Sequence, residues 1–167
     1  MVPDGMRETH TPQPPAPPAA DEIAALSGLE ILTAMLDGRL PPPPIADAMG
    51  FHVAEVGEGR VMFRGTPAQT MTNPMGTVHG GWYGTLLDSA MACSVLSRVP
   101  KGASYTTLEY KVNIIRPIPL GTEIEAVGVA QHAGRSTGVA MGEIRGRDDQ
   151  RLYATGSTTC IVFSPRP

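Results

Sequence analysis

Apolar and polar residues alternate most regularly between positions 107 and 114. The two sets interleave one by one: Leu108, Tyr110, Val112 and Ile114 alternate with Thr107, Glu109, Lys111 and Asn113. A period of two predicts a β-strand with one buried face. Turns rich in Gly, Pro and Asp separate further apolar segments, which predict strands over residues 51–56, 61–63, 122–131, 135–145 and 151–163. The first two of these form a predicted hairpin around the sequence Gly-Glu-Gly at 57–59.

The segment from residue 80 to residue 98 has a different pattern, because its apolar and small residues cover nearly every side of a helix. Such a helix is expected to be buried. The strands of the second half carry small residues inside them, namely Gly128, Gly138, Ala140, Gly142, Ala154 and Gly156. Glycine within a strand often marks close approach by another element. We therefore expect an α+β fold, in which a curved antiparallel sheet wraps around one long central helix.

The N-terminal quarter of the chain divides into two parts. Residues 1–19 are rich in Pro and Ala and predict a disordered tail. Residues 20–38 carry apolar side chains at mostly helical spacing and predict an extra N-terminal helix ending at Gly38. Pro41–Pro44 predicts a stiff polyproline connector, so that residues 20–44 precede a main domain at 45–163.

Length and charge exclude several classes of protein. With 167 residues the chain is long enough for one hydrophobic core. A net charge of −3 without a basic run argues against nucleic acid as a partner. No apolar run approaches the roughly 20 residues of a membrane span, and the first residues lack the layout of a secretory signal. Two cysteines at no metal-ligand spacing favour a cytoplasmic protein without a metal site.

Asp88 is the acidic residue in the middle of the predicted central helix. A carboxylate on an apolar helix costs stability unless it is exposed, paired or used. Gly81 and Gly84 lie seven and four residues before it, so a stripe of glycines leads up to the carboxylate. This stripe favours a general base or nucleophile with room beside it. The alternative is a buried aspartate satisfied by hydroxyls such as those of Thr85 or Ser89.

Gly80 and Gly81 begin the same helix, where backbone N–H groups are unpaired and the helix dipole is positive. Without side chains they let a ligand oxygen come close to these donors, although they equally permit tight packing of the helix start. Gly80 and Asp88 are separated by about 12 Å of helix. Reacting groups must lie within about 3–3.5 Å of one carbonyl. An active site that uses both residues should therefore lie between two protomers packed antiparallel.

The motif Asn73-Pro74, Gly76, His79-Gly80-Gly81 and Asp88 resembles the signature of hotdog-fold thioesterases of the phenylacetic-acid-degradation (PaaI) type, relatives of the 4-hydroxybenzoyl-CoA thioesterases. By order of elements the resemblance extends over residues 45–163. It implies a hotdog fold, acyl-CoA thioester hydrolysis and a dimer of dimers with shared active sites. It also implies roles for individual residues. Asp88 would be base or nucleophile, the Gly80 N–H would polarise the carbonyl from the opposite subunit, and Asn73 would position the reacting groups. Thr107, with Thr106 as an adjacent possibility, would hold the water.

Other residues are candidates for substrate binding. His79 and Gly81 precede or begin the helix and are placed to contact substrate. Trp82 and Tyr83 are candidates for the acyl pocket, with core packing as the alternative. Arg116 and Arg135 are candidates for the phosphates of coenzyme A, with a solvated turn as the alternative. Cys93 lies in the apolar run without a histidine neighbour and is expected to be a buried structural thiol.

The function expected from these residues is acyl-CoA thioesterase activity on an aromatic or a short- to medium-chain acyl group. No cofactor is implied, since coenzyme A is part of the substrate. Two alternatives stay open. One is a hotdog-fold hydratase or dehydratase, although the nine-residue spacing of His79 and Asp88 does not match that arrangement well. The other is a non-catalytic acyl-CoA-binding or sensor protein.

Overall fold

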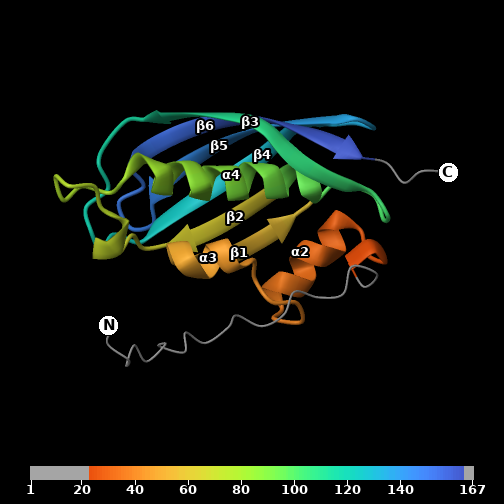
Figure 1. Ribbon diagram of the computed structural model, residues 1–167, viewed down its shortest axis with the longest axis horizontal. Helices are drawn as coiled ribbons and strands as arrows, with labels where there is room; N and C mark the ends of the chain where they lie inside the picture. Colours follow the sequence, from red (N-terminus) through yellow and green to blue (C-terminus); the bar gives the residue numbers. More distant parts are fainter. Residues whose placement is uncertain (1–22, 164–167) are drawn as a thin grey trace, which may run out of the picture.

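The computed structural model describes residues 23–163, so the predicted disordered tail lies outside the described residues. Six antiparallel strands form one sheet in the order β1-β2-β4-β5-β6-β3. Their bounds are β1 Phe51–Gly57, β2 Arg60–Gly65, β3 Ser104–Ile114, β4 Ile124–Ala133, β5 Thr137–Gly146 and β6 Leu152–Phe163. The helix α4, Gly80–Leu96, lies in the hollow of the curved sheet (Figure 1). The predicted α+β fold, a curved sheet around a central helix, is confirmed.

The helix α4 packs directly against the backbone of the sheet. A Cβ atom on Gly128 of β4 would lie 2.1 Å from the carbonyl oxygen of Ala90, and one on Gly138 of β5 would lie 2.2 Å from Val95 Cγ1. Larger residues at these strand positions would push the helix away from the sheet. The prediction that the glycines mark close approach of another element is therefore confirmed.

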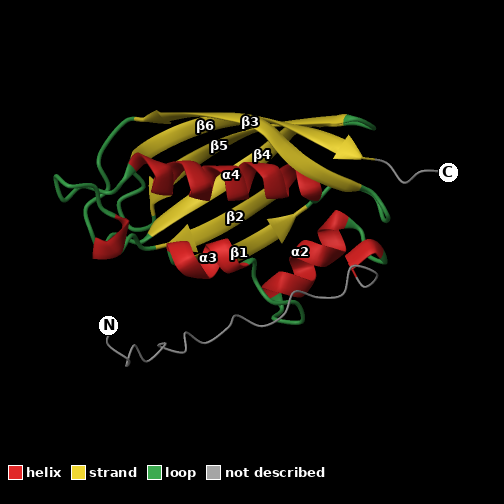
Figure 2. Cartoon of the chain, in the orientation of Figure 1, coloured by secondary structure: helices red, strands yellow, loops and turns green. Residues whose placement is uncertain are grey.

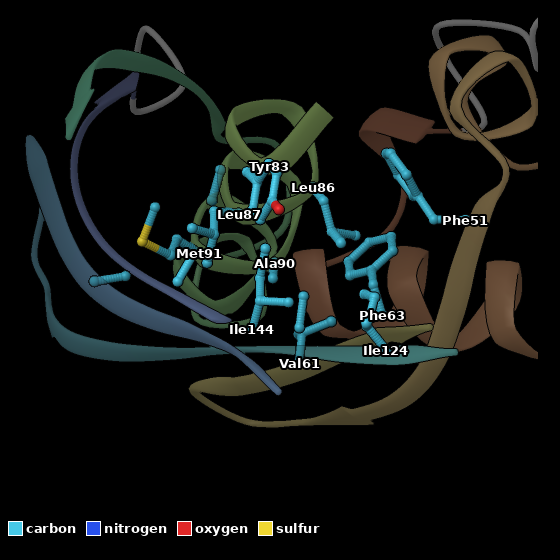
Figure 3. Packing of buried hydrophobic residues seen from close by; sticks show 14 of the residues in the cluster. Phe51, Val61, Phe63, Tyr83, Leu86, Leu87, Ala90, Met91, Ile124 and Ile144 are labelled. Atoms are coloured by element: carbon cyan, nitrogen blue, oxygen red, sulfur yellow. The ribbon is translucent and has the colours of Figure 1, made fainter. Parts of the chain in front are cut away.

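The hydrophobic core fills the space between α4 and the sheet (Figure 3). Leu86, Leu87, Ala90 and Met91 of α4 are fully buried. They meet apolar side chains of the strands, among them Val61, Phe63, Ile124 and Ile144. The side chains that face solvent on α4 are few, which is why the pattern of this helix is apolar on nearly every side.

The N-terminal helical region differs from the prediction of one helix over residues 20–38. The helix α2 runs only from Gly28 to Leu36 and begins at a capping box: Ser27 Oγ accepts the N–H of Glu30, and the Glu30 carboxylate accepts the N–H of Ser27. Gly28 contacts the end of α4, and its N–H donates to the Val99 carbonyl at 3.0 Å. The break before Gly28 therefore follows from local capping and from this close contact.

A second difference is the short helix α3, Pro44–Met49, where the polyproline connector was predicted to end. Pro44 occupies the first helical position, which tolerates proline because the N–H there has no helical partner. Gly50 ends the helix with a left-handed φ of 68°. A 3₁₀ turn, η1 Gln69–Met71, also lies between β2 and α4. Helices and strands are distinguished by colour in Figure 2.

Candidate active site

Asp88 projects from the middle of α4 toward the edge strand β3. It is partly buried, and its Oδ1 accepts a hydrogen bond from Thr107 Oγ1 at 2.9 Å. Burial raises the pKa of Asp88 above its ordinary value, and the Thr107 hydrogen bond opposes that rise. A carboxylate in this setting is more basic than one in water. The hydroxyls named as alternative partners are used within the helix instead, since Thr85 donates to the Gly81 carbonyl and Ser89 to the Thr85 carbonyl.

At Gly84 the glycine stripe leading to Asp88 is filled by a side chain of β3, which corrects the expectation of free space at that position, whereas Gly81 is exposed and lines a cavity. A Cβ atom on Gly84 would lie 3.2 Å from the hydroxyl oxygen of Tyr110 on β3. A Cβ atom on Gly81 would lie 3.0 Å from Nδ1 of His79. Gly84 therefore serves the close approach of β3 to the helix.

The start of α4 presents one free backbone donor. His79 is the N-cap residue, and its Nδ1 accepts the N–H of Gly81 at 2.9 Å. The N–H of Trp82 donates to the His79 carbonyl at 2.9 Å. The N–H of Gly80 has no acceptor among residues 23–163. The structure thus separates the two glycines of the first turn, because only Gly80 keeps a donor for a ligand.

A loop built around Asn73 lies against this donor. The Asn73 side chain accepts the N–H groups of Met75 and Thr77 and donates to Thr77 Oγ1 at 2.8 Å. Gly76, with a φ of 77°, completes the tight turn. The Asn73 side chain therefore holds the loop together, a role that the sequence motif did not predict. Thr77, its partner in this loop, was not predicted as a site residue.

Two cavities flank the first turn of α4. One has a volume of about 360 Å³ and is lined by Asn73, Gly80, Tyr83, Ile114 and Arg116, among others. The other has a volume of about 270 Å³, and its lining includes Met49, Met71, His79, Gly81 and Trp82. A larger hollow of about 530 Å³ lies on the outer face of the sheet, away from Asp88. Gly80, whose N–H is free, lines the first cavity.

Trp82 and Tyr83 are buried and their polar atoms are satisfied within the fold. Trp82 Nε1 donates to the Met49 carbonyl at 2.9 Å. The Tyr83 hydroxyl accepts the N–H of Ile118 at 2.8 Å and donates to the Arg116 carbonyl at 3.3 Å. The two rings pack edge to face. Both side chains thus hold the start of α4 in place, and they also form parts of the cavity walls.

The two candidate arginines lie at opposite ends of α4. Arg116 lines the cavity at Gly80, and its guanidinium donates to the Leu152 carbonyl. Arg135 lies in the turn between β4 and β5, close to Gly138, which packs against Val95 near the other end of the helix. Within one chain, Arg116 lines the same cavity as Gly80, whereas Arg135 does not.

Thr106 and Thr107 are distinguished by the faces of β3 on which they lie. Thr107 contacts Asp88, whereas the neighbouring Thr106 is exposed and lies on the other face of the strand.

Cys93 is a free thiol near this contact, and burial raises its pKa to about 12. A thiol with that pKa is protonated at neutral pH and unsuited to nucleophilic attack, in agreement with the structural role expected for it.

Within residues 23–163, no three His, Cys, Asp or Glu side chains lie close enough together to hold a metal ion. No helix of the same region is long and apolar enough to cross a membrane.

Comparison with known proteins identifies the class. The sequence profile of the thioesterase superfamily matches residues 75–153, which include Gly80, Asp88 and Thr107. A conserved protein of Pseudomonas aeruginosa has a similar structure, with 30% identity over 73% of this chain and 95% of that one and a TM-score of 0.68. The chain therefore belongs to the thioesterase superfamily, and the expectation of a thioester hydrolase is confirmed at the level of the family.

Two further solved structures bear on the resemblance noted above. A phenylacetic acid degradation-related protein from Ralstonia eutropha JMP134 is 29% identical over 78% of this chain and 98% of its own, with a TM-score of 0.70. A hypothetical thioesterase protein from Streptococcus pneumoniae TIGR4, solved with coenzyme A, is 24% identical over 71% and 89%, with a TM-score of 0.63. The resemblance to PaaI-type hotdog thioesterases is confirmed. No curated protein matches the chain.

Proposed function

We propose that this protein is an acyl-CoA thioesterase in which Asp88 activates water or attacks the thioester carbonyl directly. The observation that carries the proposal is the pair formed by Asp88 and Thr107 at the open edge of the sheet. Burial makes the carboxylate more basic, and the Thr107 hydroxyl, which gives its hydrogen to Asp88, would accept one from a water beside it. The likeness to a hypothetical thioesterase solved with coenzyme A supports a coenzyme A ester as substrate.

The free N–H of Gly80 is the proposed oxyanion donor. Gly80 lines a cavity at the positive end of a 17-residue helix, where developing negative charge is stabilised. Asn73 shapes the loop beside this donor, and Arg116, which lines the same cavity, is the proposed partner of a phosphate of coenzyme A. When Asp88 acts as base, it takes the proton of water and the oxygen of that water adds to the carbonyl. Collapse of the tetrahedral intermediate then expels the thiolate, which takes up a proton.

The proposed site is shared between two protomers. Within one chain Gly80 and Asp88 are about 12 Å apart along α4, too far to act on one carbonyl. The edge strand β3 exposes large apolar side chains, namely Leu108, Tyr110 and Ile114, with Ile115 just beyond the strand. An exposed apolar edge favours pairing with another strand. A second copy on this edge, with its helix antiparallel, would bring its Gly80 toward Asp88.

Several features of the expected protein remain part of this proposal. We propose a dimer of dimers, a cytoplasmic location and a reaction without a cofactor other than the coenzyme A of the substrate. The free state of both Cys93 and Cys160 supports a reducing compartment. His79, Gly81, Trp82, Tyr83 and Arg135 stay candidates for substrate contact once a second protomer is present.

The experiment that tests the proposal measures thiol release from a panel of aromatic and aliphatic acyl-CoA esters. The wild type, Asp88→Asn and the exposed-turn control Asp148→Asn are compared, each with a circular dichroism spectrum to show folding. We expect turnover by the wild type and the control, and a loss of about a thousandfold or more in Asp88→Asn. Turnover retained by Asp88→Asn would refute the role of this carboxylate. Formation of a conjugated enoyl thioester would instead identify a hydratase, and tight binding without turnover a sensor.

A further inference from the structure

The strand β3 contains a bulge beside Asp88. Thr107 pairs with Cys160 of β6 and Glu109 pairs with Thr159, so Leu108 between them has no partner on β6. Side chains of a regular strand alternate between faces, and residues 107 and 110 would then lie on opposite faces. The extra residue changes the alternation. As a result both Thr107 and Tyr110 face α4, where they contact Asp88 and Gly84.

Two polar side chains of β6 lie behind this bulge. Thr158 is 1% exposed and Cys160 is 0% exposed. Thr158 Oγ1 donates to the carbonyl oxygen of Glu109, next to the bulged residue, at 2.7 Å. Cys160 lies directly opposite Thr107 in the pairing of β6 with β3. These contacts join the bulge, the Thr107 hydroxyl and the interior of β6 into one network.

The hydrogens of this network have defined acceptors. A threonine hydroxyl carries one hydrogen. Thr107 gives its hydrogen to Asp88, and Thr158 gives its hydrogen to Glu109. Because Thr107 has no second hydrogen to give, only the thiol of Cys160, directly opposite it on β6, can donate in a hydrogen bond between these two side chains. A donor on this side of Thr107 keeps the hydroxyl hydrogen directed at the carboxylate.

We propose that Thr158 and Cys160 are positioning residues of the active site. Thr158 holds the β3 bulge, and Cys160 fixes the Thr107 hydroxyl so that its hydrogen meets Asp88. The inference rests on the proposed function, since it gives Asp88 its orientation for the reaction. The other titratable groups that interact with Asp88 are Cys93 on its own helix, Tyr105 on β3 and Cys160 on β6. Burial raises the pKa of each and keeps all three uncharged at neutral pH.

The test follows the Asp88 carboxyl itself, by NMR titration of protein labelled with ¹³C in its aspartate carboxyl groups. Thr158→Val and Cys160→Ala remove the two positioning groups, and Cys160→Ser keeps a donor at the same place. Thr159→Val is the matched control, because it lies on the same strand with its side chain on the other face. Thr107→Val shows the effect of losing the hydrogen bond altogether.

We expect the Asp88 titration to move to higher pH in Thr158→Val and Cys160→Ala, in the same direction as in Thr107→Val, because the Thr107 hydroxyl is no longer held toward the carboxylate. Cys160→Ser and Thr159→Val should titrate as the wild type does. On the ester that the wild type hydrolyses best, kcat should fall about three- to tenfold in the first two variants with KM unchanged.

An unchanged Asp88 titration in folded Thr158→Val and Cys160→Ala would overturn the inference and leave these residues a packing role only. If Thr158→Val does not fold, the comparison of Cys160→Ala with Cys160→Ser decides the question alone. The titration needs no substrate. A wild type without turnover would therefore refute the proposed function. An Asp88 titration that is the same in the variants as in the wild type would refute this inference.

Discussion

The hydroxyl of Thr107 and the carboxylate of Asp88 meet across the gap between β3 and α4, at 2.9 Å. The two residues lie 19 positions apart in the chain and come together only because α4 lies against the sheet. The contact gives the helix carboxylate a specific partner on the open edge of the sheet.

Removing the charge of Asp88 should stabilise the protein. Burial raises the folded-state pKa of Asp88 above its unfolded value, so this group favours the folded state most below the unfolded pKa. That contribution is lost as the pH rises through the folded pKa, and the carboxylate then opposes folding. Asp88→Asn should therefore have a higher Tm than the wild type at pH 7.

In a protein of this length, each 1 kcal/mol gained in the free energy of unfolding raises Tm by about 2–4 °C. Thermal unfolding of both proteins between pH 3 and pH 8 provides the measurement. The difference in Tm should shrink toward the acid end, where the wild-type carboxyl is protonated. A wild type that is more stable than Asp88→Asn at pH 7 would contradict the sign of this argument.

Gly80→Pro should remove the proposed oxyanion donor while leaving the helix intact. Gly80 is the first residue of α4, where proline is tolerated, and His79 has the extended conformation that a following proline requires (ψ 138°). Gly80→Ala is the matched control, because its Cβ would make only an ordinary contact, 3.4 Å from Ile114 Cδ1.

We expect Gly80→Pro to lower kcat by about a hundredfold or more, as the loss of an oxyanion donor does elsewhere, with a much smaller effect in Gly80→Ala. Steady-state thiol release with the best ester measures both. Equal activity in the two variants, with the same helical content, would show that the Gly80 N–H does not stabilise the transition state.

Mixed dimers test whether the site is shared between protomers. Co-refolding Asp88→Asn chains with Gly80→Pro chains should restore part of the wild-type activity. One of the two sites in a mixed dimer would then combine an intact Asp88 with an intact Gly80 from different chains. Affinity tags of two kinds isolate the mixed species before thiol release is measured. Isolated mixed dimers as inactive as the parent variants would eliminate the shared arrangement.

Gly128→Ala should destabilise the fold through a backbone collision. Its Cβ would lie 2.1 Å from the Ala90 carbonyl oxygen, which belongs to α4 and has no side-chain freedom to move aside. We expect a loss of about 3 kcal/mol or more in the free energy of unfolding. Gly57→Ala is the control, because its Cβ would meet its nearest neighbour at 3.6 Å. Urea denaturation compares the two variants, and equal losses would show that α4 shifts without cost.

The fold could be predicted because its main elements have strong and simple patterns. The alternation in β3 predicted the strand although Leu108, Tyr110 and Ile114 are exposed in the chain. The apolar surface of α4 reflects its burial, and the small residues of β4 and β5 indicate the helix that they touch. The start of α2 was missed although Ser27 and Glu30 have the spacing of a capping box. The helix α3 was missed because a run of prolines is compatible with both a connector and a first helical turn.

The site was only partly predictable for a physical reason. Asp88 stands out because a carboxylate on an apolar helix needs an explanation, and the place of Gly80 follows from the ends of that helix. The space beside Gly84 is filled by the side chain of Tyr110, and this side chain faces α4 because of the bulge in β3. The apolar and polar residues of this strand alternate without interruption, so the sequence pattern does not predict the bulge. The inward positions of β6 did hold a signal, since Thr158 and Cys160 are polar within an otherwise apolar and small-residue series.

The unpaired residue in β3 constrains how the gene for this protein can change. Substitutions of Leu108 alter one exposed side chain and leave the strand register as it is. Deletion of a single codon between positions 107 and 110 would remove the bulge, and Thr107 and Tyr110 could then no longer face α4 together. Insertion of one codon would have the same result. We therefore expect the length of this short segment to stay fixed across related sequences.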